Sequence, residues 1–506
     1  MKTASTSLSP SGSDPGTEQS LRSGRLGVVG IVFFVVAAAS PLVGMTGALP
    51  AAILLGNGAA APGAYLLAGL ILLLFSVGYA AMSHQVTNSG AFFAYIGRGM
   101  GLHLGVGSAF VSLLAYLAIH LSIFGFFGGL MAEQVGGLPW WGWSLVAWAA
   151  VTWLSLRSVD VGAHVLGLLM GLELLSLVVT SVAIFVQGGP EGWNFAASFS
   201  PANILAGGLA GSAGIALAFA FASFVGFEAT AIYGEESINP KRTVPLATYV
   251  AVVLITVLFA FTSFAVVSGL GADKVMDRVV ELSSVDGAPL VNPANVLFTL
   301  AGQYVGDWLS ALMKSLVLSS LFAAMLAFQN SAARYLFALG RGGTLPAAVA
   351  KVNQRGAPSA GSIIVSVITA AVIALFALAG LDPILNMFFW FSGLAVVSIL
   401  LIEILVCLAV IAWFRRVPGD SNLFQSLIAP VLAAVGLSVG LYLLLARFGL
   451  LTGAVAEGLD PTTTAWAMNG LGWFMALMPF GVLVLGYFFA IARHKENKEL
   501  IQDVIS

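Results

Sequence analysis

Long apolar stretches joined by short polar loops fill most of this chain. A helix needs roughly 20 apolar residues to cross the hydrocarbon core of a bilayer, and most of these stretches are that long. Only 8% of the 506 residues are charged, against about 25% in a soluble globular domain, so a soluble protein could not cover its surface. The 34 Phe and 11 Trp also exclude a disordered chain. The pattern predicts an all-α integral membrane protein with about 12 transmembrane helices.

The expected spans follow Leu26, after a polar segment at residues 1–24 that we predict to be a disordered cytoplasmic tail. A second polar segment, residues 493–506, is predicted to be a cytoplasmic C-terminal tail. The predicted spans are residues 27–56, 61–83, 102–131, 143–156, 160–187, 208–236, 246–268, 307–339, 359–380, 384–413, 423–448 and 470–492.

Lys and Arg lie almost entirely on one side of the predicted membrane. With the N-terminus inside, only Lys274, Arg278 and Arg447 fall in outer loops. Because cytoplasmic loops of membrane proteins carry an excess of Lys and Arg, we expect an even number of helices with both termini cytoplasmic. The expected location is the cytoplasmic (inner or plasma) membrane.

The first span contains residues that interrupt helices. Pro41 removes a backbone donor and clashes with the preceding turn. Glycines follow at both ends of the segment Gly44–Gly47, and Pro50 comes next. We therefore predict an unwound segment at Gly44–Gly47, whose freed N–H and C=O groups survive in a membrane only when they line a cavity enclosed by protein.

The sixth span carries a second interruption, with Ser223 and Gly226 at its centre and Glu228 just beyond. The N-terminal end of a half-helix attracts a carboxylate, and bare carbonyl groups hold an ammonium. Breaks five helices apart match a five-plus-five inverted repeat. The predicted units are a first repeat at 25–190, a second repeat at 200–415 and two further helices at 420–492.

Three segments resemble the amino acid–polyamine–organocation (APC) superfamily of transporters, in their amino acid permease-like form. SFVGFEATAIYGEESINPKRTVPLAT (Ser223–Thr248) contains the Ser-Phe-x-Gly-x-Glu stretch and the Asn-Pro-x-Arg-x-x-Pro turn of that superfamily. TNSGAFFAYIGRGMG (Thr87–Gly101) and RYLFALGRGGTLP (Arg334–Pro346) agree in register. One departure is the first-span break, which usually reads Gly-Ser/Ala-Gly and here reads Gly44-Met45-Thr46-Gly47.

The resemblance implies a leucine-transporter-like fold and secondary active transport of an amino acid or amine. It places the substrate carboxylate at the backbone of Gly44–Gly47, and the amino group at carbonyls of the sixth span. Phe328 falls where some relatives carry a pocket aromatic, and the third span, with Tyr116 and His120, lines the pocket in this fold. The predicted substrate-binding residues are Val43, Gly44, Met45, Thr46, Gly47, Tyr116, His120, Phe221, Ala222, Phe224, Val225 and Phe328.

Charged groups inside a membrane cost at least about 2.5 kcal/mol near its centre, so they are functional candidates. Glu228 lies near the sixth-span break, and its protonation could couple to opening. Glu173 lies in the middle of the fifth span, where several relatives carry a lysine; an acid there could carry a proton or help to bind a cation. Ser319 and Ser320 would be the natural oxygen ligands if sodium binds.

The function we expect is secondary active transport of a small, neutral amino acid by alternating access, coupled to a proton or, alternatively, to Na⁺. An amino-acid exchanger and a polyamine or amine importer remain alternatives. A channel, a sensor or a membrane enzyme is a different class of alternative, but the chain has no CxxC, HExxH or Walker phosphate loop. No cofactor or metal site is expected. The net charge of -2 gives no basic field for nucleic acid, so the expected partners are a small-molecule substrate and the lipid bilayer.

Overall fold

The computed structural model describes residues 27–84, 92–157, 163–208, 211–231, 237–354, 356–417 and 421–496. The tail predicted at 1–24 lies outside these residues, as do residues 497–506 of the C-terminal tail and parts of two motifs, at 87–91 and 232–236.

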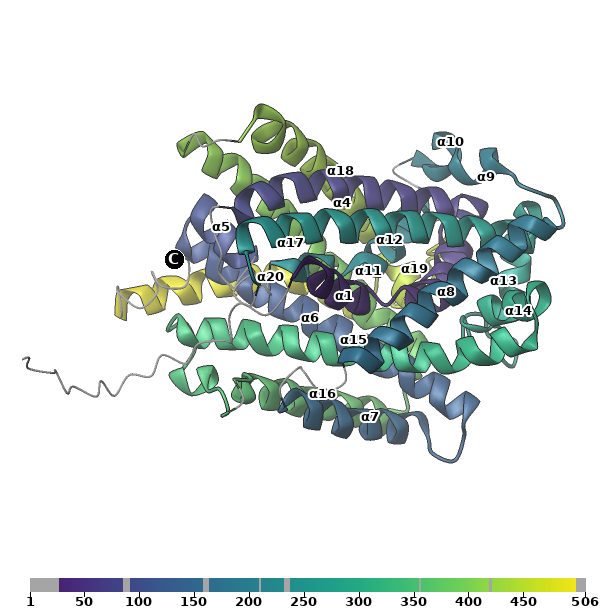
Figure 1. Cartoon of the computed structure of the whole chain (residues 1–506), viewed down its shortest axis with the longest axis horizontal. Helices are drawn as coiled ribbons and strands as arrows, with labels where there is room; N and C mark the ends of the chain where they lie inside the picture. Colours follow the sequence, from purple (N-terminus) through teal and green to yellow (C-terminus); the bar gives the residue numbers. More distant parts are fainter. Residues whose placement is uncertain are drawn as a thin grey trace, which may run out of the picture.

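The described part of the chain is built from helices, as Figure 1 shows, and the predicted all-α fold is confirmed. Helices suit a membrane because each helix satisfies its own backbone hydrogen bonds. The first half contains α1 (Val28–Ala39), α2 (Pro41–Val43), η1 (Gly44–Ala48), α3 (Leu49–Ala51), η2 (Ala52–Asn57), α4 (Ala61–Ser83), α5 (Phe92–Met100), α6 (Leu102–Gln134), α7 (Trp140–Ser155), α8 (Ala163–Gln187), α9 (Phe195–Phe199) and α10 (Pro201–Ile204).

The second half has the same character. Its elements are α11 (Ala213–Phe224), η5 (Phe227–Thr230), α12 (Pro240–Leu270), α13 (Val275–Ser283), α14 (Asn295–Tyr304), α15 (Asp307–Arg341), α16 (Ser359–Leu378), η8 (Pro383–Phe388), α17 (Phe389–Arg416), η9 (Phe424–Ile428), α18 (Ala429–Ala446), α19 (Phe448–Thr452) and α20 (Gly470–Glu496).

Ten helical stretches in the described residues are long and apolar enough to cross a membrane. The first of them, Val28–Ser83, contains two of the predicted passes, because the backbone leaves helical geometry at Gly56 and turns at Gly58 (φ 58°). Helix α7 has 16 residues, so it is shorter than these ten, and it occupies the place of the predicted fourth pass. The division of the chain into two inverted repeats stays a prediction.

Helix α6 runs through the interior and packs against α15, α17 and α20 (Figure 1). Helices α4 and α12 lie side by side. Gly69 of α4 allows this close approach, since a Cβ at Gly69 would overlap the side chain of Thr256. This arrangement places α1, α11 and α15 around the middle of the bundle, where the two broken spans meet.

The first span breaks at Ser40, and the predicted break at Gly44–Gly47 is wrong by one turn. Helix α1 ends at Ala39, and Ser40 has left-handed backbone angles (φ 44°, ψ 70°). Pro41 explains the position, because a proline disfavours the α conformation of the residue before it and has no N–H to donate. The segment Gly44–Ala48 instead forms a continuous, wide π-helical turn.

The sixth span breaks where the sequence predicts. Helix α11 ends at Phe224, Val225 is extended (φ -54°, ψ 126°), and Gly226 has φ 116°. Gly226 faces the first break: a Cβ built on it would lie 2.8 Å from the Cβ of Ala38. The two interruptions therefore contact each other inside the bundle.

Candidate functional site

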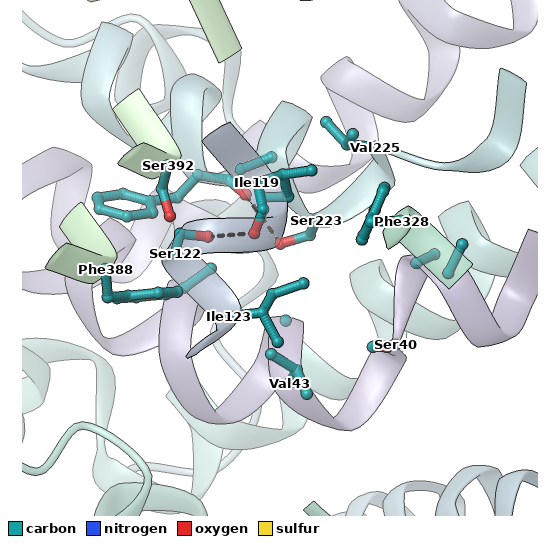
Figure 2. Close-up of a pocket in the computed structure, with 16 residues that line it drawn as sticks. Ser40, Val43, Ile119, Ser122, Ile123, Ser223, Val225, Phe328, Phe388 and Ser392 are labelled. Carbon is teal, nitrogen blue, oxygen red and sulfur yellow. Dashed lines mark hydrogen bonds between the residues drawn. The ribbon is translucent and has the colours of Figure 1, made fainter. Parts of the chain in front are cut away.

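A small cavity of about 50 Å³ lies between the two breaks. Figure 2 shows its lining, which comes from the first span, α6, α11, the segment after it, α15, η8 and α17. None of the lining side chains is charged. They are Ala38, Ala39, Ser40, Val43, Gly44, Ala48, Ile119, Ser122, Ile123, Phe219, Ala222, Ser223, Val225, Phe328, Phe388 and Ser392.

Five of the predicted substrate-binding residues line this cavity. Val43 and Gly44 come from the first span, Ala222 and Val225 from the sixth, and Phe328 from α15. Phe328 also lies beside Tyr116 of α6, with ring centroids 6.1 Å apart. The structure thus brings together the two breaks and one aromatic side chain that the sequence pattern singles out.

Seven other predicted residues are not part of the lining. The Thr46 hydroxyl donates to the Leu42 carbonyl oxygen at 2.7 Å, so it bonds within its own helix. The Phe224 ring packs against Phe259, and the Phe221 ring lies against Gly440 of α18. The seven are Met45, Thr46, Gly47, Tyr116, His120, Phe221 and Phe224.

On α6 the face that lines the cavity is shifted from the predicted one. Ile119, Ser122 and Ile123 point to the cavity, with the three- and four-residue spacing of one helix face. His120 is fully buried beside Phe124, with ring centroids 4.9 Å apart. The signal that sequence reasoning missed is the hydroxyl side chains of Ser122 and Ser392 within the predicted third and tenth spans.

A buried carboxyl group lies next to the first break, outside the cavity lining. Glu173 of α8 is 4% exposed. Its Oε1 accepts a hydrogen bond from the Leu42 N–H at 2.7 Å and another from the Ser320 hydroxyl at 2.9 Å. The Leu42 N–H has no acceptor in its own helix because the helix begins at Pro41. Glu173 therefore caps the half-helix that starts at the break and ties it to α15.

The two serines predicted as sodium ligands behave differently. Ser320 bonds to Glu173, and its carbonyl oxygen accepts a hydrogen bond from Ser40 at 3.4 Å. Ser319 donates to the Leu316 carbonyl oxygen at 2.8 Å within α15. A cleft lined by Glu173, Ser319 and Ser320 runs beside the first break.

A second buried carboxyl group stands at the sixth break. Glu228 is 1% exposed. Its Oε2 accepts a hydrogen bond from the Gly226 N–H at 2.9 Å, and its Oε1 accepts one from the Tyr116 hydroxyl at 2.9 Å. The Glu228 carbonyl oxygen accepts a third bond, from the Tyr79 hydroxyl at 2.7 Å. The sixth break is thus connected to α6 and to α4.

The interior near Glu228 holds further ionisable groups. Glu403 of α17 is 2% exposed, and its Oε2 has no hydrogen-bond partner in the described part of the chain. Cys407, one turn further along α17, is buried and free. Among the described residues no group of three or more His, Cys, Asp or Glu side chains could hold a metal ion.

Comparisons with known proteins also indicate an amino acid transporter. Residues 30–500 match the family described as "Amino acid permease". The chain is 26% identical over 354 residues to a protein named branched-chain amino acid permease BcaP from Lactococcus lactis, covering 64% of this chain and 70% of the relative. It is 22% identical over 419 residues to a protein of the same name from Bacillus subtilis (78% and 83%). A third relative, named cationic amino acid transporter 4, vacuolar, from Arabidopsis thaliana, is 25% identical over 335 residues (62% and 52%).

Proposed function

This chain belongs to the amino acid permease family, and we propose that it carries a small, neutral amino acid across the membrane by alternating access, driven by a proton. The family and the names of the relatives indicate an amino acid transporter rather than an enzyme. The size and charge of the substrate and the coupling ion are the parts that we propose.

The observation that carries the proposal is an uncharged cavity between two facing helix breaks. An amino acid has two charged ends and one variable side chain. Glu173 accepts from the Leu42 N–H of the half-helix that begins at Pro41, so the substrate carboxylate would meet the rest of that positive helix end. Carbonyl groups at the end of α11 suit the ammonium. No charged side chain lines the remaining space, so a charged substrate side chain would lose its water without gaining a counter-charge.

The relatives support this preference without deciding it. Two carry names that specify branched-chain amino acids, whose side chains suit a lining of Val43, Ile119 and Ile123. The plant relative is named as a cationic transporter. In this chain Glu173 and Glu228 lie behind the breaks, where they bond to the protein, and do not line the cavity.

We assign the proton to Glu228. Its carboxyl oxygens bond to the sixth-span break and to Tyr116 of α6, and its carbonyl oxygen bonds to Tyr79 of α4. Binding or release of a proton on the carboxyl group changes its hydrogen bonds to the Gly226 N–H of the break and to Tyr116 of α6, and coupling to a conformational change requires such a difference between two states. We further propose that the protein resides in the cytoplasmic membrane with both termini inside.

Uptake into proteoliposomes tests the proposal. Purified protein should accumulate labelled valine or leucine when the outside is more acidic, and a protonophore should abolish accumulation. Arginine and putrescine, at tenfold excess, should not compete. Competition by putrescine equal to that of leucine would overturn the neutral substrate. Uptake that needs internal amino acid and ignores the pH gradient would indicate an exchanger and overturn proton coupling.

A further inference from the structure

Four serine side chains line the cavity, and three of them have their hydroxyl groups occupied by the protein. The Ser40 hydroxyl donates to the Ala37 carbonyl oxygen at 2.7 Å. The Ser122 hydroxyl donates to the Ile119 carbonyl oxygen at 2.8 Å, and the Ser223 hydroxyl to that of Phe219 at 2.8 Å. These hydroxyls are satisfied without a substrate.

Ser392 is the fourth, and it differs. It lies on α17 with 3% of its surface exposed, and its hydroxyl forms no hydrogen bond with any described residue. A serine in a helix commonly donates to a carbonyl in the preceding turn, as Ser122 does. Because Ser392 lines the cavity, a molecule bound there could supply the hydrogen-bond partner that the protein does not, since a hydroxyl can both donate and accept.

The position of Ser392 says which part of a substrate could supply that partner. Figure 2 shows Ser392 and Phe388 at one side of the cavity, with Ser40 and Val225 of the two breaks at the other. If the charged ends of an amino acid occupy the breaks, its side chain extends toward Ser392. The other lining residues near Ser392 in Figure 2 are Phe388, Ile119 and Ser122, and the Ser122 hydroxyl already donates to the Ile119 carbonyl oxygen.

We propose that the Ser392 hydroxyl is a recognition group for a hydroxyl on the substrate side chain, so that the site takes small β-hydroxy amino acids such as threonine. This inference rests on the proposed function of the same cavity. Threonine and valine have nearly the same shape, and only a hydroxyl in place of a methyl separates them. A serine hydroxyl can donate a hydrogen bond to the threonine hydroxyl and accept one from it. An apolar wall offers that hydroxyl no hydrogen bond and so cannot favour threonine over valine.

The rest of the pocket sets the size of this substrate class. Phe388 stacks on Phe126 of α6 with ring centroids 4.8 Å apart and closes the wall beside Ser392. The cavity is small, about 50 Å³, and Phe388 bounds it on the side of Ser392. The subsite therefore favours a hydroxyl on a short side chain over the phenol of tyrosine.

Competition against labelled valine in proteoliposomes tests the inference, with Ser392→Ala as the variant and Ser398→Ala, on the same helix but outside the lining, as the matched control. In wild type, threonine should inhibit valine uptake at least as well as unlabelled valine. In Ser392→Ala, inhibition by threonine should weaken about tenfold, roughly the effect of one net hydrogen bond, while inhibition by valine changes less than twofold. Ser398→Ala should leave the ratio unchanged, because Ser398 does not line the cavity and its hydroxyl donates to the Leu394 carbonyl oxygen.

The outcomes separate this inference from the proposed function. Wild-type protein that takes up no neutral amino acid would overturn both. Valine uptake with a threonine-to-valine ratio that Ser392→Ala does not change would overturn only the role of Ser392. If Ser392→Ala does not fold, the wild-type measurement still decides: threonine competing tenfold more weakly than valine would contradict a hydroxyl subsite.

Discussion

Each helix break has a buried carboxyl group beside it, but the two carboxyls are supplied and used differently. Glu173 comes from α8, 131 residues away from the Leu42 N–H that it caps, and a single oxygen, Oε1, accepts both of its bonds. Glu228 lies two residues from the Gly226 N–H that it caps, and each of its oxygens accepts one bond. The carboxyl at the first break thus comes from another helix, whereas the carboxyl at the sixth break comes from the same segment and also bonds to α6.

The difference has a consequence for protonation. A proton on the Oε2 of Glu173 would disturb neither bond, because both donors use Oε1. A proton on Glu228 binds an oxygen that already accepts a bond, from Tyr116 or from the Gly226 N–H, and it weakens that oxygen as an acceptor. Glu173 is therefore suited to stabilise the first break in either protonation state. Protonation of Glu228 instead changes its hydrogen bond to Tyr116 of α6.

The largest expected effect concerns the contact between the two breaks. Gly226→Ala forces an alanine into φ 116° and places its Cβ 2.8 Å from that of Ala38. Left-handed backbone costs about 1–2 kcal/mol and overpacking about 1–3 kcal/mol, so the variant should lose about 2–5 kcal/mol of stability and most transport. Thermal unfolding in detergent measures it. Adding Ala38→Gly should restore the packing part only, and an unchanged unfolding temperature in the single variant would contradict the facing arrangement.

Next in size is the brace at the first break. Glu173→Ala leaves the buried Leu42 N–H without an acceptor, at a cost of about 1–3 kcal/mol. Glu173→Gln should fold nearly as well as wild type, because one amide oxygen can accept both bonds that Oε1 accepts. Thermal unfolding of the two variants, side by side, checks this. Equal destabilisation by both would mean that the negative charge, and not the acceptor, holds the break.

Much of this fold follows from the sequence, because long apolar stretches leave a membrane protein few options. The sixth break was predictable, since Gly226 lies at the centre of its span. The sequence predicts the first break at Gly44–Gly47, yet Gly44 packs against Ser223, where a Cβ on Gly44 would lie 3.2 Å from the Cβ of Ser223. The helix instead ends before Pro41, whose effect on the preceding residue decides the position.

The lining of α6 could not be read from the sequence. This helix is largely apolar on every side, and most of its residues are buried in the structure. An all-round apolar helix has no polar face to fix its rotation. The sequence therefore favours the ionisable His120 and its neighbour Tyr116 as lining residues. In the structure, packing turns Ile119, Ser122 and Ile123 toward the cavity instead.

A third prediction separates the two carboxyls by pH. If one proton binds together with the substrate, the apparent affinity for valine should change by up to about tenfold per pH unit, which is about 1.4 kcal/mol. Glu228→Gln should remove this slope, and Glu173→Gln should keep it. Uptake measured at several external pH values decides between them. A slope lost in Glu173→Gln and kept in Glu228→Gln would reverse the assignment.

The smallest expected effect lies on α15, where two adjacent serines form a matched pair. Ser320→Ala removes one of the two donors to Glu173 but leaves the Leu42 N–H capped, so the loss of stability should be about 0.5–1.5 kcal/mol. Ser319→Ala should be nearly silent, because the Ser319 hydroxyl bonds only to the Leu316 carbonyl oxygen of its own helix. Thermal unfolding of both variants measures the difference.

The serine pair also tests the reading of the first break as a structural brace. If the only role of Ser320 is to steady Glu173, Ser320→Ala combined with Glu173→Ala should be no less stable than Glu173→Ala alone, because the donor and its acceptor are then both absent. Additive losses in the double variant would show that Ser320 stabilises α15 through some other contact. The brace at the first break would then consist of Glu173 and Leu42 alone.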